Sequence, residues 1–120
     1  MILYETTVND AGPEVEIFAE KGMLITFAQK AIVTLKDYCY YIEKNDVKGD
    51  LKTAGKIDID GKEYEVTQVG SIAEANLKTL GHVTISFNGD GECLPGSICT
   101  KKAKVPVLKK GSRITILAKS

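Results

Sequence analysis

Alternation of apolar and polar residues predicts short β-strands along most of this chain. The clearest signal is a hairpin over residues 56–69, in which two alternating segments flank Asp60-Gly61. This pair favours a two-residue turn because both of its positions adopt a positive φ readily. In the resulting register Lys56 lies opposite Glu65, which predicts an ion pair across the two strands.

Further strands are indicated by short segments rich in β-branched and aromatic residues and bounded by Gly, Asn, Asp or Pro. The periodicity of Leu35–Ile42 does not decide between a strand and a turn. Ile98–Val107 is expected to be extended, with Pro106 restricting any pairing there to a sheet edge. The four clearest strands are Leu3–Val8, Met23–Phe27, His82–Phe87 and Arg113–Ala118.

One short helix is predicted over about residues 71–80. Ser71-Ile72-Ala73-Glu74 matches a capping box, in which the serine hydroxyl and the glutamate carboxylate each accept a hydrogen bond from an N-terminal amide. Gly81 stands where a left-handed C-cap residue is expected. Many short strands with one helix predict a mainly β fold. We expect a single domain, a small closed or partly open β-barrel or sandwich.

The charge of the chain is balanced overall but unevenly distributed. The 120 residues include 16 Lys+Arg and 16 Asp+Glu, which excludes a wholly basic nucleic-acid coat. All 16 acids lie in residues 1–92, whereas residues 93–120 hold seven bases, all within the stretch 101–119. These bases fit either solvated strand faces or a surface for an acidic partner or a phosphate. Because no aromatic residues are interleaved with them, nucleic-acid binding is not expected.

Neither a membrane segment nor a metal site is predicted. No apolar run reaches the roughly 20 residues of a spanning helix, and no signal-peptide pattern precedes Glu5, so we expect a cytoplasmic protein without membrane insertion. Cys39, Cys93 and Cys99 form no Cys-x-x-Cys pair, and reduced thiols are expected. Together with His82 they would supply a zinc ligand set, but their spacing does not match that of structural zinc sites.

His82 is the only histidine and the main candidate for chemistry. Alternation over His82–Asn88 places His82, Thr84 and Ser86 on a polar strand face, opposite an apolar one. This pattern fits a solvated histidine without a role as well as a general base, a nucleophile or a ligand. No hydrolase signature and no glycine-rich phosphate-binding motif accompany it, so neither hydrolysis nor an ATP-using kinase is expected.

The stretch Val69–Thr84 is the most distinctive part of the sequence, since a strand end, the capped helix and the histidine strand follow with almost no connection. Together with Met23–Phe27 and Asp37-Tyr38-Cys39, it resembles the glucitol/sorbitol-specific IIA component of the phosphoenolpyruvate-dependent sugar phosphotransferase system. The resemblance runs from near Tyr4 to about Arg113. It implies a compact β-barrel-like domain.

The resemblance also implies a phosphotransferase component with a phosphohistidine intermediate. Such a protein accepts a phosphoryl group from the histidine-containing phosphocarrier protein and passes it to the IIB part of a IIB/IIC sorbitol permease. His82 would be the acceptor, with Thr84 and Ser86 as positioning hydroxyls. Gly81 would give partners close backbone access, and the amides at Gly70-Ser71-Ile72 form a second candidate anion site. No cofactor is implied.

One departure from the family keeps an alternative open. Relatives can carry a histidine shortly after the Tyr-Cys-aromatic segment, at a position proposed as the phosphoacceptor, whereas this chain has Tyr41-Ile42-Glu43-Lys44. Either His82 is the acceptor, or this member is a regulatory or docking module that has lost phosphotransfer. His82 also follows the carboxyl end of the predicted helix, where partial negative charge disfavours a phosphate. Exposed edge strands would allow a homodimer.

Overall fold

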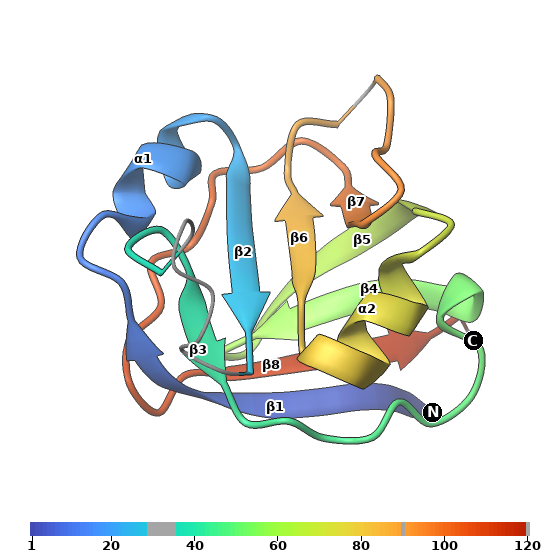
Figure 1. Ribbon diagram of the computed structural model, residues 1–120. Helices are drawn as coiled ribbons and strands as arrows, with labels where there is room; N and C mark the ends of the chain where they lie inside the picture. Colours follow the sequence, from blue (N-terminus) through green and yellow to red (C-terminus); the bar gives the residue numbers. More distant parts are fainter. Residues whose placement is uncertain (29–35, 90, 120) are drawn as a thin grey trace.

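A computed structural model describes residues 1–28, 36–89 and 91–119 (Figure 1). Over these residues, eight strands close into a barrel in the order β1-β3-β2-β6-β7-β5-β4-β8, which confirms the predicted mainly β class. Two helices and one 3-10 turn complete it: α1 (Val15–Glu20), α2 (Ala73–Leu80) and η1 (Leu51–Thr53). The strands are β1 (Ile2–Ala11), β2 (Met23–Phe27), β3 (Tyr40–Ile42), β4 (Ala54–Ile59), β5 (Lys62–Val69), β6 (Val83–Ser86), β7 (Ser97–Thr100) and β8 (Arg113–Ala118).

The predicted strands are largely present, with some changes at their ends. β2 and β8 have the predicted bounds, whereas β1 is longer and β6 is shorter than predicted. Of the undecided segment Leu35–Ile42, the last three residues form β3, and Leu35 lies outside the described residues. The extended segment at Ile98–Val107 contributes only its first residues, to β7. α1 and η1 were not predicted.

The hairpin of β4 and β5 has the predicted turn and register. Asp60 and Gly61 have φ values of 53° and 92°, and Lys56 lies opposite Glu65. The predicted ion pair is wrong, however, because Lys56 Nζ lies 2.9 Å from a carboxylate oxygen of Glu63, diagonally across the hairpin. Glu65 instead pairs at 3.0 Å with Lys101, which follows β7 on the other side of β5.

Closure of the barrel bears on the expected homodimer. β1 and β8, the two ends of the strand order, pair with each other in antiparallel register. The exposed edge strands that suggested a dimer are therefore not found in the described part of the barrel, because each strand there has two neighbours. A homodimer remains a prediction without this support.

Apolar side chains form two clusters, one inside the barrel and one on its outside. The interior cluster includes Phe87, Leu77 and Ile57, each at most 1% exposed. Burial of each such side chain contributes roughly 1.5–3 kcal/mol relative to leaving it in water. The second cluster, called here the outer cluster, covers the opposite face of β2 and β3 beside α1. It consists of Ile25, Phe27, Cys39 and Tyr41, with Phe18 of α1 packed against them.

The helix α2 begins differently from the prediction. None of the described side chains caps its N-terminus, so the predicted capping box is wrong. The amides of Gly70 and Ile72 instead donate to main-chain oxygens of Ser97 and Pro95, at 2.7 and 2.9 Å. Because main-chain oxygens at and just before the start of β7 satisfy these donors, the carboxylate of Glu74 is free to accept a hydrogen bond from a residue outside α2.

Two of the three cysteines are paired. Cys93 and Cys99 form a disulfide with a Cα–Cα separation of 6.0 Å, so the expectation of three reduced thiols is wrong for this pair. The turn at residues 94–97 brings them together, although their spacing in the sequence carries no recognised signature. Cys39 is a free and buried thiol. Within the described residues, no helix is both long and apolar enough to cross a bilayer.

Candidate functional site

His82 lies at the junction between α2 and β6. Gly81 ends α2 in the left-handed conformation, with a φ of 62°, and the chain then turns directly into the strand. The predicted alternation along β6 is confirmed, because Val83 and Ile85 are buried whereas His82 and Thr84 are partly exposed. The imidazole therefore lies on the outer face of the barrel, not in its core.

Two consecutive residues of β2 contact the imidazole. Its Nδ1 lies 3.1 Å from the main-chain oxygen of Thr26. The ring of Phe27 is stacked on it, with 4.0 Å between the ring centroids and 8° between the planes. Phe27 belongs to the outer cluster and is itself 5% exposed. The imidazole is thus held in one orientation at the border of an apolar cluster.

Hydrogen bonds from β2, and from Ala28 directly after it, hold the segment that carries His82. The hydroxyl of Thr26 donates to the main-chain oxygen of Gly81 at 2.9 Å. The amide of Ala28 donates to the oxygen of Leu80 at 3.0 Å. Since these bonds flank His82 on its N-terminal side, they fix the backbone from which the ring projects.

The carbonyl groups at the end of α2 are largely engaged in the fold. Leu80 O accepts from Ala28, and Asn76 O accepts from the main-chain amide of His82 at 3.2 Å. Such partners reduce the uncompensated negative charge at a helix C-terminus. The hydrogen bonds at the end of α2 therefore weaken the electrostatic repulsion of a phosphate that the sequence led us to expect there.

Of the two candidate hydroxyls, Thr84 is the nearer to the imidazole. Side chains two residues apart on one strand face are about 7 Å apart, and those four residues apart are about 13 Å apart. Ser86 lies at the longer separation, and its hydroxyl accepts from the amide of Asn88 at 3.3 Å. Thr84 lies opposite Ile25 on β2 and opposite Ser97 on β7. Of these two hydroxyls, that of Thr84 is therefore the better placed relative to His82.

The remaining candidates have roles in the fold. Gly81 is buried, and a Cβ at this position would meet Ala28. The amides of Gly70 and Ile72 are already bonded, and they lie at the opposite end of α2, whose eight residues span about 12 Å. The second candidate anion site, which includes the exposed Ser71, is therefore separate from the imidazole.

The residues considered for zinc are not assembled. Cys93 and Cys99 are bonded to each other, and Cys39 is buried in the outer cluster. Burial raises the pKa of the Cys39 thiol to about 11. Among the described residues, no group of three or more His, Cys, Asp or Glu side chains is placed to hold a metal ion.

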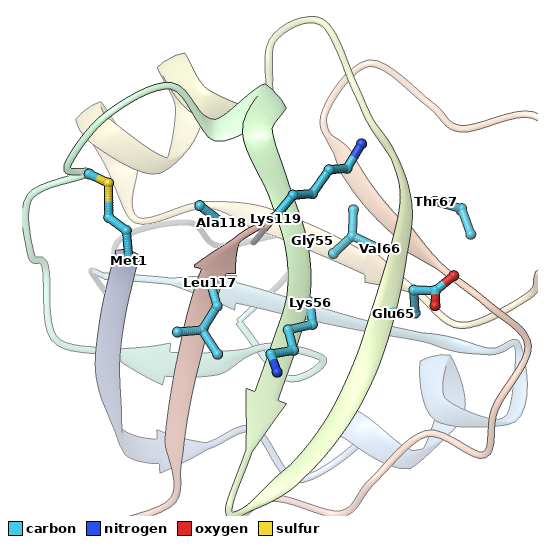
Figure 2. Close-up of a pocket in the computed structure, with 9 residues that line it drawn as sticks. All are labelled: Met1, Gly55, Lys56, Glu65, Val66, Thr67, Leu117, Ala118 and Lys119. Atoms are coloured by element: carbon cyan, nitrogen blue, oxygen red, sulfur yellow. The ribbon is translucent and has the colours of Figure 1, made fainter.

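An open groove of about 910 Å³ lies elsewhere on the barrel (Figure 2). It opens where β4 and β5 separate beyond the pair Lys56 and Glu65, and its lining includes Leu117 of β8. None of its lining residues belongs to β2 or β6, the elements around the histidine. The groove is therefore not part of the site.

Comparisons with known proteins agree on one family. Residues 3–115 match the family model of the PTS system glucitol/sorbitol-specific IIA component. Two relatives described as PTS system glucitol/sorbitol-specific EIIA components, from Shigella flexneri and Escherichia coli (strain K12), are each 37% identical over 98 residues. These matches cover 81% of this chain and 80% of each relative.

A solved structure supports the fold. The crystal structure of a PTS system IIA component from Enterococcus faecalis V583 matches with a TM-score of 0.79 and 24% identity, covering 96% of this chain and 100% of that one. The matched family model spans nearly the whole described chain and includes both β2 and the histidine segment. This chain belongs to the glucitol/sorbitol-specific IIA components of the sugar phosphotransferase system.

Proposed function

We propose that this chain is a cytoplasmic phosphoryl carrier in which residues 1–120 act as one IIA domain. It accepts a phosphoryl group on His82 from the histidine-containing phosphocarrier protein. It then passes the group to the IIB part of a glucitol/sorbitol permease. The observation that carries this proposal is the imidazole of His82, partly exposed on the barrel surface and held by Thr26 and Phe27.

The chemistry requires little more than a positioned imidazole. Phosphoryl transfer between two histidines breaks one N–P bond as another forms, and catalysis consists mainly of alignment and charge stabilisation. A neutral imidazole nitrogen supplies the electron pair that attacks phosphorus. The hydroxyl of Thr84 can donate a hydrogen bond to a phosphoryl oxygen. A lysine of the basic stretch 101–119 or a group of the partner would supply the cationic charge beside the phosphate.

A regulatory or docking module without phosphotransfer is the second candidate. Its support is the absence of the histidine that relatives can carry after the Tyr-Cys-aromatic segment. Here that part of the chain is β3, whose Ile42 is buried in the barrel interior at 1% exposure. Glu43 and Lys44, which follow, have exposed side chains. In its charged form neither side chain offers a nitrogen or sulfur lone pair that could attack phosphorus.

Phosphopeptide mapping tests the proposal. The full chain is incubated with phosphoenolpyruvate, enzyme I and the phosphocarrier protein, and acid-labile phosphate is located by mass spectrometry. We expect the label on His82 and at least a 100-fold loss of labelling in His82→Gln, because glutamine keeps a polar side chain but cannot form the intermediate. Asn88→Gln, beyond the end of β6, is the matched control and should label normally.

Two results would contradict this assignment. Equal labelling of the wild type and His82→Gln would mean that a different residue is the acceptor. Absence of labelling in the wild type, together with retained binding to the permease, would select the docking module instead. Circular dichroism of each variant establishes that a loss of label is not a loss of fold.

A further inference from the structure

We propose that Thr26 and Phe27 are positioning residues that fix the imidazole of His82 in the tautomer with its proton on Nδ1. The phosphoryl group is then received by Nε2. The second statement rests on the proposed function, whereas the first concerns the free protein and holds without it. The two can therefore be tested separately.

The tautomer follows from the partner of Nδ1. The main-chain oxygen of Thr26, 3.1 Å away, has lone pairs and no proton, so it can only accept a hydrogen bond. Nδ1 must therefore carry the proton. A neutral imidazole has a single N–H, which leaves the lone pair on Nε2 available for attack on phosphorus.

The position of this carbonyl is fixed from several sides. β2 pairs with β6 in antiparallel register, with Thr26 opposite Val83. The hydroxyl of Thr26 donates to Gly81 O, so the same residue bonds to both the imidazole and the backbone that precedes it. A 180° flip of the ring about its Cβ–Cγ bond would put the Cδ2 carbon in the place of Nδ1 and lose the hydrogen bond to Thr26 O.

Phe27 restricts the tilt of the imidazole ring. Its ring lies nearly parallel to the imidazole, and its side chain belongs to the outer cluster together with Ile25 and Tyr41. Because Phe27 is buried, it cannot move aside without breaking that packing. The stack therefore holds the imidazole plane while the carbonyl selects the nitrogen.

The same contact favours the phosphorylated state. During transfer the N–P bond of the donor breaks and a bond from Nε2 to phosphorus forms, while the Nδ1 proton stays in place. The ring then becomes an N-phosphorylated imidazolium, whose N–H is a stronger donor to the Thr26 carbonyl than that of a neutral imidazole. Attachment at Nδ1 would instead replace this proton and break the hydrogen bond.

Nitrogen NMR of the full ¹⁵N-labelled chain tests the tautomer directly. At a pH where the imidazole is neutral, long-range ¹H–¹⁵N correlations should identify Nδ1 as the protonated nitrogen and Nε2 as the unprotonated one. After phosphorylation by phosphoenolpyruvate, enzyme I and the phosphocarrier protein, the phosphorus coupling should appear at Nε2. A proton on Nε2, an average of both tautomers, or phosphorus at Nδ1 would overturn the inference.

Matched variants of two phenylalanines separate positioning from packing. Phe27→Leu keeps an apolar side chain but removes the stacked ring, and we expect averaged tautomer signals and phosphorylation about tenfold slower. Phe18→Leu makes the same change in α1, where the ring packs against the outer cluster and contacts Tyr38, and it should leave both the signals and the rate unchanged. Wild-type tautomer signals in Phe27→Leu would overturn the role of Phe27. If wild-type protein shows the Nδ1–H tautomer but is never phosphorylated, only the proposed function fails.

Discussion

Two features of the structure require glycine at position 81. Gly81 ends α2 with a φ of 62°, which penalises any side chain, and it lies against Ala28, where a Cβ would find no room. We expect Gly81→Ala to lower the free energy of unfolding by about 2–4 kcal/mol, because the backbone penalty and the contact with Ala28 add. Urea denaturation followed by circular dichroism measures the change.

A second glycine separates the two contributions. Gly111 also has a positive φ, of 95°, but among the described residues, its two chain neighbours aside, no atom lies within 4 Å of a Cβ placed there. Gly111→Ala should therefore cost only the backbone penalty of about 1–2 kcal/mol. Equal losses in the two variants would show that Ala28 adds nothing, and that the junction before His82 tolerates a larger residue.

At the scale of elements, Glu74 links α2 to η1. Its carboxylate accepts from the amide of Leu51 at 2.6 Å and pairs with Lys78 of the next helical turn at 3.1 Å. The hydrogen bond from Leu51, and then the one from Lys78, lowers the pKa of Glu74 below its ordinary value of 4.5. The ionised carboxylate therefore favours the folded state.

This linkage gives stability a defined dependence on pH. Because the pKa of Glu74 is lower in the folded than in the unfolded chain, its contribution is complete above about pH 4.5 and is lost as the pH falls through the folded value. We expect Glu74→Gln to cost about 1 kcal/mol at pH 7, and the difference from wild type to shrink in acid. Glu20→Gln, at an exposed position of α1, should change neither. Denaturation curves from pH 3 to 7 provide the measurement, and a constant difference would contradict this account.

Elements with a local signal were predictable from the sequence, and those built by distant contacts were not. Asp60-Gly61 specifies the hairpin, and alternation specifies the inner and outer faces of β6. The six residues of α1 are too few for a helical periodicity to emerge. The Cys93–Cys99 pair and the loop carbonyls at α2 depend on how β7 pairs with β5 and β6, which no local pattern encodes.

At the scale of the whole molecule, the candidate site depends on the closed barrel. The histidine was identifiable as the only one in the chain, on a polar strand face. Its partners Thr26 and Phe27 precede it by more than 50 residues, and only the pairing of β2 with β6 brings them beside it. The sequence therefore indicated the candidate histidine, whereas the strand order determines the orientation of its ring.

The closed barrel should also unfold as one unit. Ile116 in the middle of β8 lies opposite Tyr4 of β1 and Ile57 of β4, and it is 1% exposed. Ile116→Ala leaves a cavity where the barrel closes, and we expect a loss of about 2–5 kcal/mol. Its neighbour Leu117 faces the groove in Figure 2, and Leu117→Ala should cost less than about 1 kcal/mol.

Two probes of the same urea titration decide whether this loss is shared by the whole barrel. Circular dichroism reports the strands, and tyrosine fluorescence reports the surroundings of buried rings such as Tyr4 and Tyr64, since the chain has no tryptophan. For a barrel without free edges in its described strands, both signals should shift to the same lower midpoint in Ile116→Ala. If the two midpoints separated, β1 and β8 would be opening before the rest, and the strands that orient His82 would be stable without barrel closure.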